Sequence, residues 1–313
     1  MRSLSLLGAV ILLALAMPAR AQTAAPPCPP PPEPPGAAAL RAAQASDRGL
    51  LWRLSKEGRA SAYLYGSIHV GRPDWSMPGP QLARALDESD TWALELDPAD
   101  PAVQRALAEG LARRPLQPDA ELRARLARQA ALACLPEGAL EGLHPLMQAF
   151  ALSLLAARWD GLDAGYAQEQ ILSQRARALQ RPVVSLESVE IQLAALLPET
   201  PAEALAQSRE LLEQLEQDKV RPTLRRLGEA WARGDLAALE AYEQWCDCVQ
   251  SEAERDQLRR LNDARNPFLA ERIDALITRG HRLFAAVGAL HMTGPQALPR
   301  LLEQRGYRLE RLH

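Results

Sequence analysis

The same short pattern occurs near both ends of the chain. "YLYGSIH" ends at His69 and "AAVGALH" ends at His291, and each histidine comes three residues after a glycine, Gly66 or Gly288. Short apolar runs that end at a glycine are typical of buried strands. We therefore expect both histidines to lie just past the end of a strand, where an imidazole can face a crevice.

The similarity continues downstream of both histidines. "MPGPQLARALDESDTWALELD", from Met77, aligns without a gap with "MTGPQALPRLLEQRGYRLERL", from Met292, and Trp92 falls opposite Tyr307. About seven extra residues separate the histidine from this segment in the first copy. The chain therefore contains an internal repeat of the unit strand, Gly-x-x-His, loop, helix, strand.

The remaining segments predict an α/β fold. The two repeated units are expected to form a small sheet core, to which "VVSLES" adds a strand, and residues of about 100–260 read as a large helical middle segment. We expect a helical or irregular piece before the first unit. Asn266-Pro267 reads as an N-cap followed by proline at N1, opening the helix "FLAERIDALITR".

The N-terminal residues predict export. Residues 1–21 combine Arg2, an apolar run and a small-x-small site ending at Ala21, which is typical of a signal peptide. That run is shorter than the roughly 20 residues that span a bilayer, and no later segment is long and free of charge, so we expect no membrane span in the mature protein. The predicted location is periplasmic or secreted. Residues 22–47 read as a proline-rich disordered linker and 48–313 as a single domain with a helical insert at about 100–260.

Composition excludes one class of partner, and export bears on the cysteines. With 24% charged residues and a net charge of -3, the chain has no basic patch for nucleic acid. An oxidising compartment allows disulfides, and we expect Cys134 to pair with Cys246 or Cys248 and Cys28 to stay free in its linker. A lipid anchor on Cys28 is disfavoured by the residues before it, and a metal or redox site at Cys246 and Cys248 by the lack of nearby thiols and imidazoles.

Two Gly-x-x-His units packed about a pseudo-twofold axis would bring His69 and His291 together. Two neutral imidazoles and one carboxylate form a common catalytic zinc set, in which the pKa of a coordinated water falls to about 7. His144, His281 and His313 have no comparable sequence context.

Carboxylates follow two other predicted strands. Glu95 lies in "ALELD" and Glu187 in "VSLES", and a glutamate in an apolar strand is costly unless it is paired or bound to a cation. We expect one to be a ligand and the other a general base, with Asp97 and Asp163 as second-rank candidates. Arg265 could hold a carboxylate or stabilise an oxyanion. The two glutamates and Arg265 also have purely structural explanations, since a strand-end glutamate can face water and an arginine can form a surface ion pair.

These motifs, together with "GLDAGYAQEQILSQRARALQRPVVSLESVEIQL" and "NDARNPFLAERI", resemble the TraB/GumN family from about residue 48 to the last residue. Its wider relatives include the Tiki metalloproteases, PrgY, the erythromycin esterases and ChaN-like proteins. The resemblance implies an α/β fold with two Gly-x-x-His elements around one site and, in Tiki-like members, a divalent-metal-dependent peptidase. The positions that match the family's motifs are Gly66, His69, Glu95, Glu187, Arg265, Gly288 and His291.

The sequence thus predicts an exported, peptidase-like metal-dependent hydrolase. We expect His69, His291 and Glu95 to hold a divalent zinc, manganese or cobalt ion, with Gly66 and Gly288 beside the bound group. Glu95, Glu187 and Arg265 are the expected catalytic residues, and a peptide or small molecule is the expected substrate. The alternative is a non-catalytic periplasmic protein that binds a peptide, as PrgY-like members imply, or a small ligand such as haem, as ChaN-like members imply.

Overall fold

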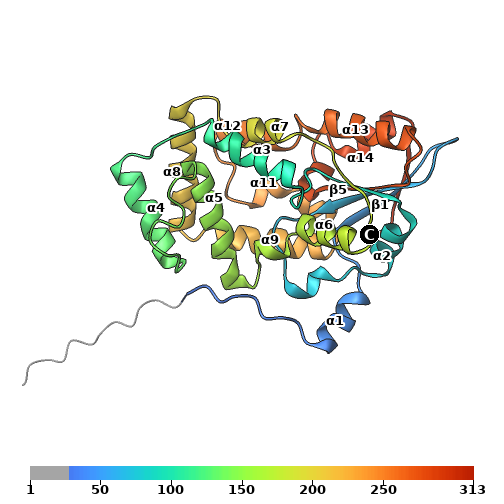
Figure 1. The fold of residues 1–313 in the computed structure, drawn as a ribbon, viewed down its shortest axis with the longest axis horizontal. Coiled ribbons are helices and arrows are strands. Elements are labelled where there is room, and N and C mark those ends of the chain that lie inside the picture. Colours follow the sequence, from blue (N-terminus) through green and yellow to red (C-terminus); the bar gives the residue numbers. More distant parts are fainter. Residues whose placement is uncertain (1–27) are drawn as a thin grey trace, which may run out of the picture.

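The computed structural model describes residues 28–313, so the predicted signal peptide lies outside the described residues. Its centre is a six-stranded sheet in the order β4-β3-β5-β2-β1-β6 (Figure 1). The four strands β4, β3, β5 and β2 are parallel to one another, and β1 runs antiparallel to both of its neighbours. The strands are β1 (Leu50–Ser55), β2 (Ala62–Ser67), β3 (Thr91–Leu94), β4 (Val183–Ser185), β5 (Leu283–Gly288) and β6 (Arg308–Arg311).

The repeat and the α/β fold are confirmed. The first unit is β2, helix α2 (Pro80–Glu88) and β3, and the second is β5, helix α14 (Leu298–Gln304) and β6. Strands β2 and β5 are parallel neighbours. The chain continues from β2 to β3 in one direction along the sheet and from β5 to β6 in the other. In such a sheet, the connections after the two carboxyl ends open a crevice between them.

Strand β1 replaces the helical or irregular piece expected there. It pairs with β2 in an antiparallel hairpin, with Leu50 opposite Gly66 and Leu54 opposite Ala62. The connecting loop contains Gly58 at φ 69°, a left-handed conformation that glycine adopts without steric cost. Strand β1 thus lies between β2 of the first unit and β6 of the second.

Helices occupy most of the chain between β3 and β5, with β4 as the one strand of that interval. Figure 1 shows many of these helices gathered to one side of the sheet, whereas α13 and α14 lie above the sheet in this view and α2 and α6 below it. The other α-helices are α1 (Ala37–Gln44), α3 (Pro101–Ala112), α4 (Ala120–Leu132), α5 (Pro145–Ala156), α6 (Gln168–Ala178), α7 (Val189–Leu196), α8 (Pro201–Glu216), α9 (Val220–Ala232), α10 (Leu236–Glu240), α11 (Tyr242–Trp245), α12 (Glu252–Leu261) and α13 (Asn266–Thr278).

The main core lies around the sheet and fixes its central strands. Strand β5 is fully buried along its length, and Phe284 packs against Tyr65 of β2 and Trp92 of β3. Trp231 of α9 is also fully buried and donates its indole N–H to the carbonyl oxygen of Gly66 at 2.7 Å. A buried tryptophan with its polar atom satisfied thus ties the helical segment to the end of β2.

The disulfide prediction was wrong. Cys28 pairs with Cys134 across 106 positions of sequence, and Cys246 pairs with Cys248. The expected disordered linker also differs from the structure, because it includes helix α1 at Ala37–Gln44. The segment before the sheet is thus tied to the end of α4 rather than independent of it.

Among the described residues, no helix combines the length and the apolar character that crossing a membrane requires.

Candidate functional site

Four adjacent parallel strands each deliver one polar side chain to the same edge of the sheet. In the order β4, β3, β5, β2, the residues that follow the strand ends are Glu187, Glu95, His291 and His69. His291 lies in the 3-10 helix η4 (Ala289–Met292), directly after β5. Both histidines therefore lie just past a strand end, as the sequence predicts.

Gly288 lies between the two histidines and Glu95. A Cβ atom on this glycine would lie 3.6 Å from His69 Nε2, 3.6 Å from His291 Cδ2 and 3.3 Å from Glu95 Oε1. Its backbone N–H donates to Glu95 Oε1 at 2.7 Å. The absent side chain leaves room at the point where the two Gly-x-x-His units meet.

Gly66 has a different role. A Cβ atom there would lie 3.2 to 3.3 Å from Leu50 Cβ, Met292 Cγ and Ala289 Cα, which all belong to the core. The first glycine thus allows close packing beneath the site, whereas we expected it beside a bound group.

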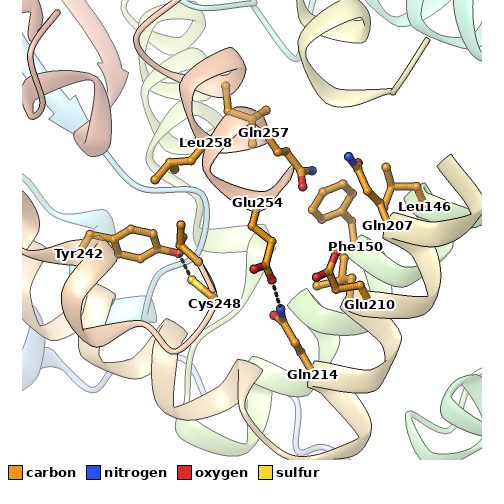
Figure 2. A pocket seen from close by; sticks show the side chains of 13 residues that line it. Leu146, Phe150, Gln207, Glu210, Gln214, Tyr242, Cys248, Glu254, Gln257 and Leu258 are labelled. Carbon is orange, nitrogen blue, oxygen red and sulfur yellow. Dashed lines mark hydrogen bonds between the residues drawn. The ribbon is translucent and has the colours of Figure 1, made fainter. Parts of the chain in front are cut away.

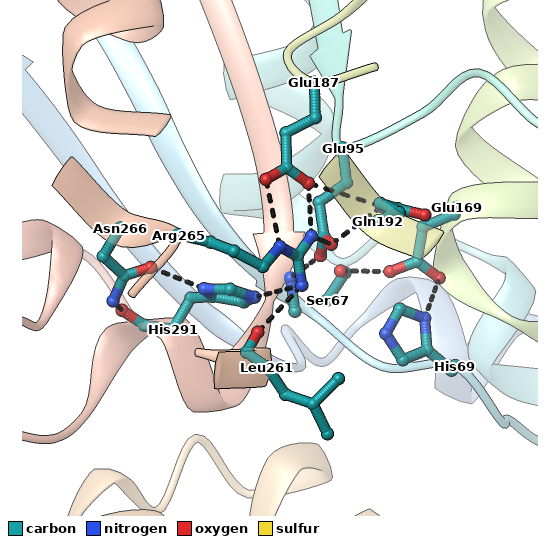
Figure 3. Close-up of polar contacts among 11 residues, drawn as sticks. Ser67, His69, Glu95, Glu169, Glu187, Gln192, Leu261, Arg265, Asn266 and His291 are labelled. Atoms are coloured by element: carbon teal, nitrogen blue, oxygen red, sulfur yellow. Dashed lines mark hydrogen bonds and ion pairs between the residues drawn. The ribbon is translucent and has the colours of Figure 1, made fainter. Parts of the chain in front are cut away.

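Glu169 of helix α6 is the site residue that sequence reasoning missed. Its side chain reaches the end of β2, where Oε1 accepts a hydrogen bond from the hydroxyl of Ser67 and Oε2 lies 3.3 Å from His69 Nδ1 (Figure 3). A sequence signal did exist, because Glu169 falls on the buried face of α6 with Leu172 and Ala176. A carboxylate at an otherwise core-facing helix position is costly without a partner.

His69, Glu95 and Glu169 together can hold a metal ion. Each offers one ligand atom, and these atoms lie within 4.8 Å of one another. Glu169 Oε2 is buried, and its contact in the site is the ion pair with His69 Nδ1, so it keeps capacity to bind a cation. The side chain of His69 is 67% exposed, which leaves the group open to solvent on one side. Two carboxylates and one imidazole with an open side suit a catalytic divalent cation.

Arg265 connects the other polar residues of the site, and its five N–H groups all have acceptors. Nε donates to Glu187 Oε1 at 3.0 Å, and Nη2 pairs with both Glu187 Oε2 and Glu95 Oε2. Nη1 donates to the carbonyl oxygen of Leu261 at 2.8 Å and faces His291 Nε2 at 3.3 Å. With no donor free, Arg265 positions these groups rather than stabilising an oxyanion. Both carboxylate oxygens of Glu187 accept hydrogen bonds from the Arg265 guanidinium, so Glu187 fixes the position of Arg265 and has no oxygen free of it to act as a base.

Asn266 fixes His291 from the other side. Its amide group donates to the carbonyl oxygens of His291 and Gln296, which leaves Oδ1 as an acceptor 2.5 Å from His291 Nδ1. The imidazole is therefore protonated on Nδ1 and accepts from Arg265 on Nε2. Asn266 is the first residue of α13, with Arg265 at the N-cap position, so the expected N-cap role of Asn266 was wrong by one residue.

The local charges set the protonation states. Glu169 raises the pKa of His69 to about 9, whereas burial lowers the pKa of His291 to about 4. Burial acts to raise the pKa of Glu95, but His291, Arg265 and His69 outweigh it and hold the value at about 2. Burial also opposes ionisation of Glu169, yet His69 and Ser67 lower its pKa overall. Both candidate carboxylate ligands are thus ionised at neutral pH.

The second-rank carboxylates lie outside this group. Asp97 accepts from Ser173 and pairs with Arg177, both on α6, at 2.6 and 2.7 Å. Asp163 pairs with Arg158 and caps a short 3-10 helix by accepting from the backbone N–H of Gly165. Hydrogen bonds within the fold account for both.

The comparisons with known proteins give one finding. Residues 50–311 match the model of the TraB/PrgY/gumN family, whereas a search of curated proteins and a search of solved structures found no match. The matched range includes all six strands and every residue of the site. The chain belongs to the TraB/PrgY/gumN family.

Proposed function

We propose that the protein is an exported, divalent-metal-dependent hydrolase that cleaves peptide bonds. The observation that carries the proposal is the group formed by His69, Glu95 and Glu169, whose ligand atoms lie within 4.8 Å of one another. Membership of the TraB/PrgY/gumN family and the sequence resemblance to Tiki-like members support a peptidase over other hydrolases. The two disulfides support an oxidising, extracytoplasmic location.

His69, Glu95 and Glu169 would hold the ion, with zinc, manganese and cobalt as the candidates. When bound there, the ion would polarise a substrate carbonyl and lower the pKa of a water molecule. Gly288 and Arg265 orient Glu95 through its two oxygens, and Ser67 orients Glu169. Such contacts behind the ligands fix their positions before substrate arrives.

His291 has a positioning role in this proposal. Its two ring nitrogens are occupied by Asn266 and Arg265, so it keeps the guanidinium in place beside Glu95. The sequence-based assignment of His291 as a metal ligand with His69 and Glu95 stays a prediction, and metal analysis of a variant tests it.

The test is metal content followed by turnover. The wild type, His69→Ala and Glu169→Gln are loaded separately with zinc, manganese and cobalt, dialysed, and measured by elemental analysis. His281→Ala serves as the matched control, because His281 contacts Thr91 at 2.9 Å, outside the group of ligands. We expect about one equivalent of one metal in the wild type and control, and loss of that metal in both site variants.

Turnover is then measured with a peptide library in the presence of the metal that binds. Cleavage that disappears with a chelator and returns on adding the metal is the expected result. Stoichiometric metal without cleavage would overturn the peptidase assignment. Absence of bound metal would overturn the proposal as a whole and favour a protein that binds its ligand without catalysis.

A further inference from the structure

A cavity of about 180 Å³ lies in the helical segment between α5, α8 and α12 (Figure 2). Apolar side chains form much of its wall, namely Leu146, Phe150, Leu211, Leu258 and Leu261. Tyr242 and Cys248 close one side, where Sγ of Cys248, which is disulfide-bonded to Cys246, lies 3.2 Å from the tyrosine hydroxyl.

The charged side chains that line the cavity are both carboxylates. Glu210 of α8 and Glu254 of α12 line it, and Gln214 Nε2 donates to Glu254 Oε1 at 3.3 Å. Gln207 Oε1 also lines it and is a buried acceptor without a hydrogen bond. Among the described residues that line the cavity, none is a lysine, an arginine or a histidine. Apolar walls with carboxylates and an unused amide oxygen suit an alkyl chain that ends in a cation.

The cavity adjoins the site at the sheet edge. Leu261 ends α12 and lines the cavity, and its carbonyl oxygen accepts from Arg265 Nη1 at 2.8 Å. An occupant of the cavity would therefore lie about one helical turn from the arginine that holds Glu95 and Glu187.

We propose that this cavity binds the cationic side chain of a substrate residue, a lysine or an arginine, with the alkyl stem against the leucines and the charge on Glu210 and Glu254. The inference rests on the proposed function, because it makes the cavity a specificity pocket of the same enzyme. Glu254 accepts from the backbone N–H groups of Gln250 and Ser251, which fixes its carboxylate in the wall.

Without an occupant, Glu210 is partly protonated near pH 7. Burial, then hydrogen bonding with Glu254 and the charges of Glu254 and Glu213, raises the pKa of Glu210 to about 7. A bound cation would replace that proton. Binding near pH 7 is therefore accompanied by the release of up to one proton per site.

Pentylamine is the probe, and 1-pentanol is its uncharged counterpart. Calorimetric titration of the full chain in two buffers of different ionisation enthalpy gives both affinity and proton release. We expect pentylamine to bind at least tenfold more tightly than pentanol and with proton release. The double variant Glu210→Gln, Glu254→Gln is expected to lose at least tenfold in pentylamine affinity. Glutamine at position 254 preserves the capping box of α12, so the fold is retained.

Glu252→Gln, on α12 but outside the cavity lining, is the control and should bind like the wild type. His69→Ala should also bind pentylamine normally, which separates this proposal from the metal site. Equal binding of pentylamine and pentanol, or unchanged binding by the double variant, would overturn the cation pocket.

The peptide acetyl-Ala-Ala-Lys-Ala-Ala-amide and its norleucine counterpart then identify the source of the cation. Tighter binding of the lysine peptide than of pentylamine supports a peptide side chain. Equal affinity of the lysine and norleucine peptides contradicts it.

Discussion

His69 Nδ1 lies 3.3 Å from Glu169 Oε2, although 100 positions of sequence separate the two residues. One follows strand β2 and the other lies on helix α6, so the contact joins the sheet to the helical segment. The carboxylate also explains why the imidazole attracts a proton, since it raises the pKa of His69 to about 9. A metal ion and a proton would therefore compete for the same group.

The first prediction separates ligands from positioning residues. Glu169→Gln should abolish metal uptake, because it removes one of the two carboxylates in the group of three ligands. His291→Ala should keep about one equivalent of metal and lose at least about 100-fold in kcat, because Arg265 would no longer be fixed. Elemental analysis beside a kinetic assay checks both. Loss of metal in His291→Ala would restore the sequence-based assignment of this histidine as a ligand.

The two repeated glycines should respond differently to the same substitution. Gly288→Ala should keep its stability, because Gly288 has φ -47°, which alanine adopts easily, but should weaken metal binding by crowding Glu95 and both histidines. Gly66→Ala should destabilise the protein by about 1–3 kcal/mol, because its Cβ would overpack the core. Denaturant unfolding and metal titration of both variants test this. The same response in both variants would contradict the separate roles.

Asn266→Asp should change the protonation of His291. In the wild type, burial holds the pKa of His291 at about 4, and the neutral amide oxygen of Asn266 adds no negative charge. An aspartate would favour the imidazolium and raise that pKa. NMR titration of the His291 ring carbons measures the shift, and Asn262→Asp, at the C-cap of α12, is the control. A His291 pKa that stays near 4 would show that Asn266 does not face its Nδ1 atom.

Glu210 should make stability depend on pH. Its pKa is about 7 in the folded protein and lower in the unfolded chain, so the folded state binds the extra proton. This contribution to stability is present below about pH 4.5 and is lost as pH rises through about 7. Compared with Glu210→Gln, the wild type should lose stability between pH 5.5 and about 8. Chemical denaturation across that range measures the difference. If the free energy of unfolding varied with pH in the same way in both proteins, the raised pKa of Glu210 would be refuted.

The Cys28–Cys134 disulfide should stabilise the whole fold. It closes a loop across 106 positions, and long loops gain most from closure in the chain-entropy model. We expect Cys28→Ser, Cys134→Ser to lower the free energy of unfolding by about 2–4 kcal/mol. The short ring between Cys246 and Cys248 should contribute less. Denaturant unfolding of both double variants decides whether that order holds.

The strand ends could be predicted from the sequence because local signals specify them. "YLYGSIH" and "AAVGALH" each carry an apolar run closed by glycine, and their positions in β2 and β5 agree with the pattern. Strand β1 was missed, although "LLWRLS" precedes a short Gly58-containing loop of the kind that joins hairpins.

Glu169 and the disulfides depend on contacts between distant segments. On α6, Glu169 resembles any helical glutamate until the buried face of the helix is known. Cys28 lies among prolines, which suggest an extended linker far from the domain, and only the fold shows that this segment reaches the end of α4. Local patterns carry no information about such pairings.

The spacing of the two Gly-x-x-His histidines originates in backbone hydrogen bonds. Strands β2 and β5 are paired side by side, with Ser67 opposite Gly288 at the last position of the ladder. Adjacent strands are held about 4.8 Å apart whatever side chains they carry. Core residues can therefore drift in sequence without moving one histidine relative to the other, and the chemistry of this edge can change while its dimensions stay the same.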